Sequence, residues 1–495
     1  MSNLSSYDSE AVGFDSVSSK KRAGTSCSTQ TSGFNESGVS SQTNLSKSCG
    51  TMATPEELNA QDDILKEYPP PGLTEFLRRV VPAMIEQLDE DDKEVYGSSD
   101  SEEEETITAK LFQEIRVADC NGAGDQATSV LALSWSSAGN SLAVSTGKLQ
   151  HENWCTHDGL IRIYTVKRTA GDKLVHLMDV TEKNCVSAVK YHPSLSTILA
   201  YGTTSGEVVM CNLGESGNLE EMQLASPSGC HGSKRVSALQ WADSPLANTY
   251  LTMQINNTGK RRGASDQILF SSGSDGTLNV WQVNAYLKIF EIVVSYVVNG
   301  SRKVAAPDIT CFDFIKCCPL RPSDERVPGD IFVVGTKSGT LFVCKIKPPQ
   351  QLERPDPVYE VLEGHRTCVL NVAFSFQKPG IFISASIDSE LRVYDISQAC
   401  PLKVLQIESP ISCVCWLPRQ PGVCVLGLSP GGAMLYNASC GRRVPVDGLA
   451  GGASSAVAAE QSGSCRIACG DAEGRVRVWE LPPRRMRCVP DDLDF

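Results

Sequence analysis

Three donors of the kind that zinc prefers lie close together in the sequence. They are His151, Cys155 and His157, which offer two imidazole nitrogens and one thiol sulfur. A structural zinc site takes four ligands, usually with cysteine pairs at shorter spacing. Three donors in this pattern therefore indicate a packed loop, and the sequence predicts no metal site here.

Catalytic motifs are equally weak. Residues 427–431 read Gly-Leu-Ser-Pro-Gly, the pattern of a nucleophile elbow, but that motif requires a strand-to-helix turn and this segment is expected to join two strands. No phosphate-binding Gly-x4-Gly-Lys-Ser/Thr motif is present. His365 and Asp388 are interpreted as a buried hydrogen-bonded pair. The sequence predicts no enzyme, no catalytic residue and no cofactor.

The elements that position these residues come from a motif that occurs seven times. A turn residue is followed two and four residues later by apolar side chains, and usually then by an aromatic one. The turn residues are Gly159, Gly206, Gly276, Gly339, Ser389, Gly431 and Gly474. Side chains two apart share one face of a strand, and a tight hairpin needs positive φ at its turn. Each copy is therefore predicted to be the second strand of a hairpin.

The spacing of the copies defines the fold class. The intervals are 47, 70, 63, 50, 42 and 43 residues, and the shortest match the roughly 40–45 residues of a four-stranded WD40 blade. We therefore expect an all-β chain, with a seven-bladed WD40 β-propeller over residues 106–484 and a short tail at 485–495. The wide intervals predict loop insertions at 213–235, 243–266 and 300–309.

The ring also needs an outer strand for its last blade. Residues 106–117 are the only β-capable run ahead of the first blade. They are therefore expected to close the ring.

Charge separates the chain into two parts. Residues 1–105 hold 21 acidic and 8 basic side chains, a balance of 8 − 21 = −13, and the remainder is balanced. This acidic arm has too little apolar surface to fold alone, and residues 1–66 are predicted to be disordered.

Composition also limits the class of partner. No large Lys/Arg cluster is present, which argues against nucleic acid and anionic membranes. The longest aliphatic run, 289–298, is too short for a membrane span, and no secretory signal opens the chain. Cysteines such as Cys211, Cys344, Cys413 and Cys415 are expected to be buried as small apolar residues, in a reducing compartment.

The arm contains a short motif twice. Thr29, Gln30 and Thr31 form the first copy, and Ser41, Gln42 and Thr43 form a second, weaker one. Such extended segments can pair as an added strand in the edge groove of a partner. The motif resembles the TQT anchor that docks in the grooves of a small dimeric dynein light chain.

An amphipathic helix is predicted within residues 67–90. Its apolar positions recur at helical spacing and form one face, made of Leu73, Phe76, Leu77, Val80, Val81, Met84, Ile85 and Leu88. Pro82 should kink or split it. An apolar face of this kind has to dock, either on the propeller or, as we favour, on a partner.

Residues 91–105 form an acidic linker. The simplest interpretation is a self-repelling spacer. Ser98, Ser99 and Ser101 also precede acidic residues, a context typical of acid-directed kinases. Both interpretations are compatible.

These features together resemble the dynein intermediate chains, above all those of the cytoplasmic dynein-2 type. The resemblance rests on residues 68–72 (Tyr-Pro-Pro-Pro-Gly) ahead of the apolar face, on the TQT-bearing arm, on the propeller, and on the loop 147–157. It implies a non-catalytic subunit of the retrograde intraflagellar-transport motor, located in the cytoplasm, cytoskeleton and cilium, including axoneme and basal body.

The resemblance also implies partners. The propeller would bind the dynein heavy chain, the TQT-like motifs a TQT-reading light chain, and the apolar face a roadblock-type light chain. Dimeric light chains would then pair the arm with that of a second intermediate chain.

Two alternatives stay open. An axonemal dynein intermediate chain also needs a heavy-chain-binding propeller, whereas the lack of an N-terminal coiled coil argues against a cytoplasmic dynein-1 chain. A WD40 adaptor of another class, such as a ubiquitin-ligase substrate receptor, is the second alternative.

Overall fold

The chain divides into two compact units, Met1–Glu102 and Glu103–Phe495, in the computed structural model. The structure describes residues 75–82 in the first unit. In the second it describes 107–117, 128–151, 155–167, 173–214, 222–227, 229–242, 266–284, 286, 289–299, 306–316, 330–346, 354–418, 420–462 and 465–482. Residues 75–82 form a helix.

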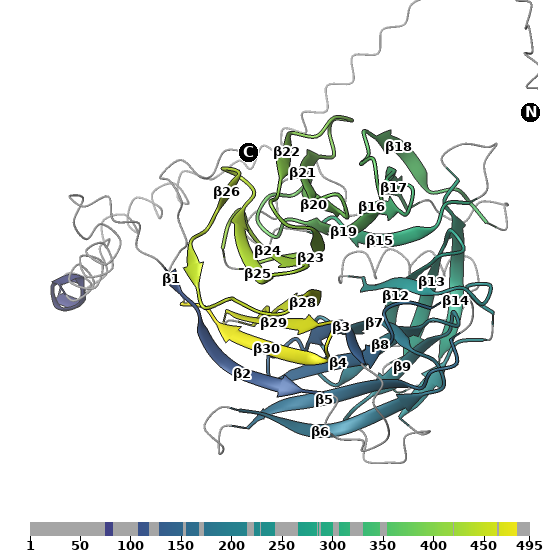
Figure 1. Ribbon diagram of the computed structural model, residues 1–495, viewed down its shortest axis with the longest axis horizontal. Helices are drawn as coiled ribbons and strands as arrows, with labels where there is room; N and C mark the ends of the chain where they lie inside the picture. Colours follow the sequence, from purple (N-terminus) through teal and green to yellow (C-terminus); the bar gives the residue numbers. More distant parts are fainter. Residues whose placement is uncertain are drawn as a thin grey trace, which may run out of the picture. The chain divides into compact units, whose positions relative to one another are not determined.

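The second unit is a seven-bladed β-propeller, as predicted (Figure 1). Each blade is a four-stranded antiparallel sheet, and adjacent blades contact one another through their innermost strands. From the inside outward, blade 1 contains β3 (Ser129–Trp135), β4 (Ser141–Gly147), β5 (Gly159–Lys167) and β6 (Lys173–Glu182); blade 2 contains β7 (Val186–Tyr191), β8 (Ile198–Thr203), β9 (Val208–Asn212) and β10 (Gln223–Ala225); blade 3 contains β11 (Val236–Trp241), β12 (Asp266–Gly273), β13 (Thr277–Asn284) and β14 (Phe290–Val297).

Three further blades follow the same order. Blade 4 contains β15 (Ile309–Phe314), β16 (Ile331–Thr336), β17 (Leu341–Lys345) and β18 (Val358–Leu362); blade 5 contains β19 (Val369–Phe374), β20 (Ile381–Ser386), β21 (Glu390–Asp395) and β22 (Lys403–Gln406); blade 6 contains β23 (Ile411–Trp416), β24 (Val423–Leu428), β25 (Gly432–Asn437) and β26 (Arg442–Arg443).

Blade 7 is completed from the N-terminal side. It contains β28 (Ser454–Ala459), β29 (Arg466–Asp471) and β30 (Arg475–Glu480), and its outer strand is β2 (Lys110–Arg116). A short parallel bridge joins β1 (Ile107–Thr108) to β27 (Val446–Asp447). The predicted closure of the ring by residues 106–117 is therefore confirmed.

The repeated motif lies where it was expected. Its seven copies are the third strands of the blades, and their apolar side chains fill the core between neighbouring sheets. The turn residue has positive φ in six copies: Gly206, Gly276, Gly339, Ser389, Gly431 and Gly474. Ser389, at φ 66°, adopts the left-handed conformation that glycine adopts elsewhere.

The first copy differs from the prediction. Gly159 is not a turn residue but the first residue of β5, and a longer connection follows β4 in place of a tight hairpin. A β-carbon at Gly159 would lie 2.1 Å from the carbonyl oxygen of Asn184. Glycine is required there because another segment packs against the backbone, not because the chain turns.

One predicted insertion was wrong in part. The segment 213–235 contains β10, the outer strand of blade 2. The composition of the segment did not reveal this strand, because the strand is only three residues long. Residues 243–265 and 300–305 lie outside the described part, and the aliphatic run 289–298 contains β14.

Residues 427–431 comprise the end of β24 and the turn into β25, so the elbow-like segment links two strands, as predicted. Cys211, Cys344 and Cys413 are buried, whereas Cys415 is only half-buried. Among the described residues, no helix is both long and apolar enough to cross a bilayer.

Candidate functional site

Most of the predicted partner-binding residues lie outside the described part of the chain. This applies to Thr29, Gln30, Thr31, Ser41, Gln42, Thr43, Leu73, Met84, Ile85 and Leu88, and to Ser98, Ser99 and Ser101. Their roles stay predictions.

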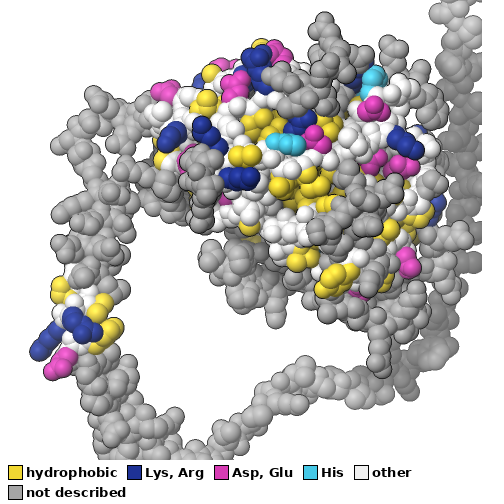
Figure 2. Space-filling model, turned by 90° about the horizontal axis from the view of Figure 1, so that it is seen from below, with side chains coloured by type: hydrophobic (Ala, Val, Ile, Leu, Met, Phe, Trp, Pro, Cys, Tyr) yellow, Lys and Arg dark blue, Asp and Glu magenta, His cyan; other side chains and the backbone are white. Residues whose placement is uncertain are grey.

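The described helix carries the centre of the apolar face. Phe76 is 50% exposed, Leu77 is 44% exposed and Val81 is 38% exposed, while Val80 is half-buried. The guanidinium of Arg79 lies 5.9 Å from the ring centroid of Phe76. Figure 2 shows these apolar side chains beside basic ones on the surface of the helix. Side chains of this size, exposed together, are suited to burial against a partner.

The outer strands of the propeller also expose single apolar side chains. The most exposed is Tyr359 on β18, at 70%. Figure 2 shows such residues scattered among charges of both signs over one side of the propeller. Scattered apolar residues are ordinary for a protein surface.

A cavity of about 580 Å³ lies along the centre of the ring and is lined by the seven innermost strands. Lys316 lines it, with Nζ 3.4 Å from Asp313 Oδ2 and 3.1 Å from the carbonyl oxygen of Phe374. Lys316 thus bonds to groups of blades 4 and 5, on either side of it.

Blade 3 holds a buried hydrogen-bond network. The His231 side chain is fully buried, with Nε2 2.8 Å from Ser271 Oγ and Nδ1 3.0 Å from Thr277 Oγ1. Trp281 Nε1 donates to the same Ser271 hydroxyl at 2.8 Å, and Asp275 Oδ1 lies 3.3 Å from His231 Nδ1. The network links β12, β13 and the turn between them to the loop ahead of β11.

Blade 5 contains a related arrangement around His365. Its Nε2 lies 2.6 Å from Ser384 Oγ, and its Nδ1 lies 3.5 Å from Glu390 Oε2. Asp388 belongs to the same cluster, but the described hydrogen bond goes to Ser384 instead. Burial and the charge of Arg392 lower the pKa of His365 to about 4, so this histidine is neutral near pH 7.

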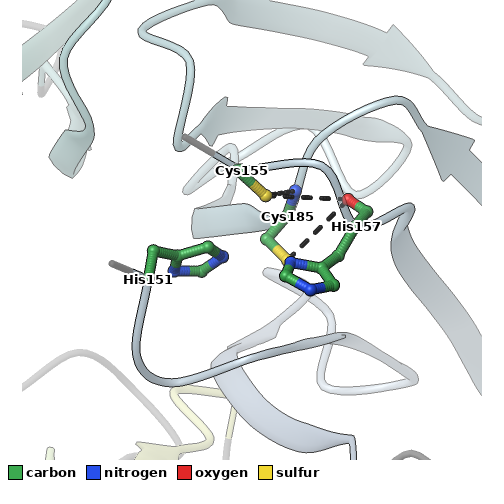
Figure 3. Close-up of side chains that lie close together, drawn as sticks. All are labelled: His151, Cys155, His157 and Cys185. Atoms are coloured by element: carbon green, nitrogen blue, oxygen red, sulfur yellow. Dashed lines mark hydrogen bonds between the residues drawn. The ribbon is translucent and has the colours of Figure 1, made fainter. Parts of the chain in front are cut away.

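The most distinctive chemical feature lies in blade 1. His151, Cys155, His157 and Cys185 place their nitrogen and sulfur donors within 4.8 Å of one another (Figure 3). The first three come from the connection between β4 and β5, and Cys185 comes from the connection between β6 and β7. Folding therefore adds Cys185 as a fourth donor to the three that lie close together in the sequence.

Two glycines make room for Cys185. A β-carbon at Gly147 would lie 2.8 Å from Cys185 Sγ, and one at Gly159 would lie 3.2 Å from its Cα. The backbone N–H of Cys185 donates to Cys155 Sγ at 3.2 Å, and its carbonyl accepts from Thr204 N at 2.9 Å. Cys185 is thus fixed between the loop of blade 1 and a turn of blade 2.

The protonation of the cluster depends on burial. Burial raises the pKa of the Cys185 thiol to about 11 and lowers the pKa of His151. Burial also acts to raise the pKa of the Cys155 thiol. Hydrogen bonds to its sulfur, including the one from the Cys185 N–H, outweigh burial and hold this pKa below its usual value. His151 Nε2 and His157 Nδ1 are buried and have no hydrogen-bond partner among the described residues.

Sequence reasoning missed Cys185 because no local spacing connects it to the other donors. It lies 28 residues beyond His157 and immediately ahead of β7. Gly147 and Gly159, which flank the loop, were the one hint in the sequence. Both are glycines because Cys185 and its neighbour Asn184 pack closely against them.

The family model of the WD domain, G-beta repeat, matches residues 356–395, which is the repeat with Ser389 in place of glycine. Cytoplasmic dynein 2 intermediate chain 2 of Mus musculus is 23% identical over 95% of this chain and 88% of its own length. The Homo sapiens protein of the same name is 22% identical over 86% of this chain and 80% of its own length. Dynein intermediate chain 2, ciliary, of Heliocidaris crassispina is 22% identical over 58% of this chain and 37% of its own length.

Proposed function

The chain is a WD40-repeat protein and a distant homologue of cytoplasmic dynein 2 intermediate chain 2, and we propose that it is a non-catalytic intermediate chain of a cytoplasmic dynein-2 motor. The observation that carries this proposal is the extent of the similarity. It covers 95% of this chain and therefore includes residues of the arm as well as the propeller. A similarity confined to WD40 repeats would support only a propeller, which serves many unrelated tasks.

In this proposal the propeller and the N-terminal arm bind different partners. The propeller binds the tail of the dynein heavy chain. The arm binds light chains, with residues 29–31 and 41–43 in a TQT-reading light chain and the apolar face around Phe76 on a roadblock-type light chain. Paired light chains join two intermediate chains, and the assembly acts in retrograde intraflagellar transport and cilium assembly.

The exposed helix supports this role for the arm. Phe76, Leu77 and Val81 present apolar area to solvent on one short helix, and helix-in-groove recognition uses such side chains. Bivalent light chains would raise the affinity of the pair without any new contact.

The ciliary intermediate chain favours a second candidate, an axonemal dynein subunit. That similarity covers 37% of the ciliary protein, much less than for the dynein-2 chains, so the axonemal function is the alternative. No observation favours the ubiquitin-ligase adaptor.

The test is a co-purification with the tagged full-length chain. Gln30→Ala should remove the TQT-reading light chain, and Phe76→Ala should remove the roadblock-type light chain, each by at least about tenfold. Tyr359→Ala is the control, because it truncates an exposed aromatic side chain of the propeller. If neither light chain is lost with either variant, these site assignments are wrong. Recovery of ubiquitin-ligase subunits in place of dynein subunits would support the adaptor.

A further inference from the structure

We propose that His151, Cys155, His157 and Cys185 bind one structural zinc ion, which ties the β4–β5 loop of blade 1 to the connection into blade 2. The proposal rests on residues of blade 1 and of its connection to blade 2, and it is independent of the proposed function.

The donor set is that of a structural zinc site. Two thiolates and two imidazoles form a Cys2His2 set, which in proteins is tetrahedral and selects zinc. A tetrahedral zinc ion holds such donors roughly 3.3–3.8 Å apart. Here they lie within 4.8 Å of one another, so side-chain movements of about an ångström close the site.

The orphaned nitrogens indicate that the cluster is built for a ligand. Buried polar atoms are nearly always hydrogen-bonded, yet His151 Nε2 and His157 Nδ1 have no such partner among the described residues. Figure 3 shows the ring of His151 facing the ring of His157 and the sulfur of Cys185, and the two ring centroids are 5.7 Å apart. A metal ion between them would satisfy both nitrogens.

The surroundings fit a thiolate-bound cation. The Cys185 N–H donates to Cys155 Sγ, which is a contact that orients and stabilises a ligating thiolate. Two thiolates neutralise the charge of Zn²⁺, so the nearby side chains of Lys148 and Arg235 do not oppose the metal.

A disulfide between Cys155 and Cys185 is the competing use of the same sulfurs. It would leave both orphaned nitrogens unsatisfied, because a disulfide gives them no hydrogen bond or bond to metal. Zinc accounts for all four side chains, and a disulfide accounts for two.

The position of the site explains what the ion does. Blade 1 has a long loop where other blades have a tight hairpin, and this loop lacks the strand pairing that fixes a hairpin. Cys185 lies directly ahead of β7, the innermost strand of blade 2. The ion would therefore anchor the loop to the junction between two blades.

The experiment measures zinc in the full-length protein purified under reducing conditions without chelator. We expect about one zinc per chain in the wild type and less than about a tenth of that in Cys185→Ser. Cys368→Ser is the matched control, since Cys368 lies directly ahead of β19 as Cys185 does ahead of β7, and it should keep the full zinc content.

Misfolding of Cys185→Ser is separated from ligand loss by two further measurements. His151→Asn alters a partly exposed ligand, so it should keep the wild-type circular dichroism spectrum and lose at least tenfold in zinc affinity against a chromophoric chelator. Co²⁺ added to the chelated wild-type protein should give the visible bands of tetrahedral cobalt with thiolate charge transfer.

Three results would overturn the proposal. One is a folded wild-type protein with less than a tenth of a zinc per chain and no tetrahedral cobalt spectrum. Another is a Cys155–Cys185 disulfide in the protein purified under reducing conditions. The third is an equal loss of zinc in Cys368→Ser and Cys185→Ser.

Discussion

Arg162 Nη1 donates a hydrogen bond of 2.8 Å to the carbonyl oxygen of Val117, and thereby joins blade 1 to the segment that closes the ring. The guanidinium is 2% exposed, and it also binds Asp179 through Nε at 2.9 Å and Nη2 at 3.2 Å. In addition, the side-chain amide of Gln113 on β2 exchanges two hydrogen bonds with the backbone of Leu174 on β6. The closing strand is therefore fixed to the blades on both sides of the junction.

Replacing Arg162 should weaken this junction. Arg162→Met removes three hydrogen bonds and leaves Asp179, which is 31% exposed, without its main partner. We expect the free energy of unfolding to fall by about 2–3 kcal/mol, measured by chemical denaturation. Lys337→Met is the control, because Lys337 is 72% exposed and 3.9 Å from Asp308, and it should cost less than about 0.5 kcal/mol. Equal costs for the two variants would refute the role of Arg162.

Removal of the closing strand should affect the whole propeller. A chain that starts at residue 120 lacks β1 and β2, so β30 loses its outer partner and the ring is open. We expect it to melt at least about 10 °C below a chain that starts at residue 96. Equal melting temperatures for the two truncations would contradict closure by β2.

Ser389 should be a site of removable strain. Its φ of 66° is costly for a residue with a side chain, and the turn residues of five other blades are glycines with positive φ. Ser389→Gly should stabilise the protein by roughly 0.5–1 kcal/mol, measured by thermal and chemical denaturation. Ser389→Ala keeps the strain and should give no gain. A loss of stability in the glycine variant would mean that the serine hydroxyl, not the backbone, determines the energy of this turn.

His365 should make stability depend on pH. Its pKa is lowered to about 4 in the folded protein, chiefly by burial and then by Arg392, while the usual value is 6.5. The folded state therefore binds this proton less readily than the unfolded state does. The contribution is fully present above about pH 6.5 and is lost as pH falls toward 4.

Between pH 7 and pH 5 this histidine should account for roughly 2 kcal/mol of lost stability. The measurement is chemical denaturation at both pH values, and His365→Gln should lose less stability over this interval than the wild type by about that amount. His176→Gln, which alters a half-exposed histidine, should leave the contribution of His365 in place. The same pH dependence in His365→Gln and the wild type would rule out this role.

The propeller was predictable because its signals are local. A turn followed by apolar residues two apart specifies a hairpin, as at Gly276 and Gly474, and seven such hairpins define a ring. The closing strand was predictable by elimination. The three-residue strand β10 was not, because it is too short to show a period within a Gly- and Ser-containing segment.

The candidate site was less predictable because it is not local. His151, Cys155 and His157 are visible in the sequence, but Cys185 joins them only after two connections of the propeller come together. Gly159 was wrongly predicted to be a turn residue for a related reason. Glycine is required there because the backbone of Asn184 packs against it, and the pattern of a single strand carries no information about such a contact.

We propose above all that the propeller binds the dynein heavy chain and that the arm binds the light chains. The most direct test of this proposal is quantitative mass spectrometry of the proteins that co-purify from ciliated cells with the tagged full-length chain and with residues 106–495. The account predicts that both recover a dynein-2 heavy chain, and that only the full-length chain recovers a TQT-reading and a roadblock-type light chain. Loss of the heavy chain from residues 106–495, with the propeller still folded, would contradict it.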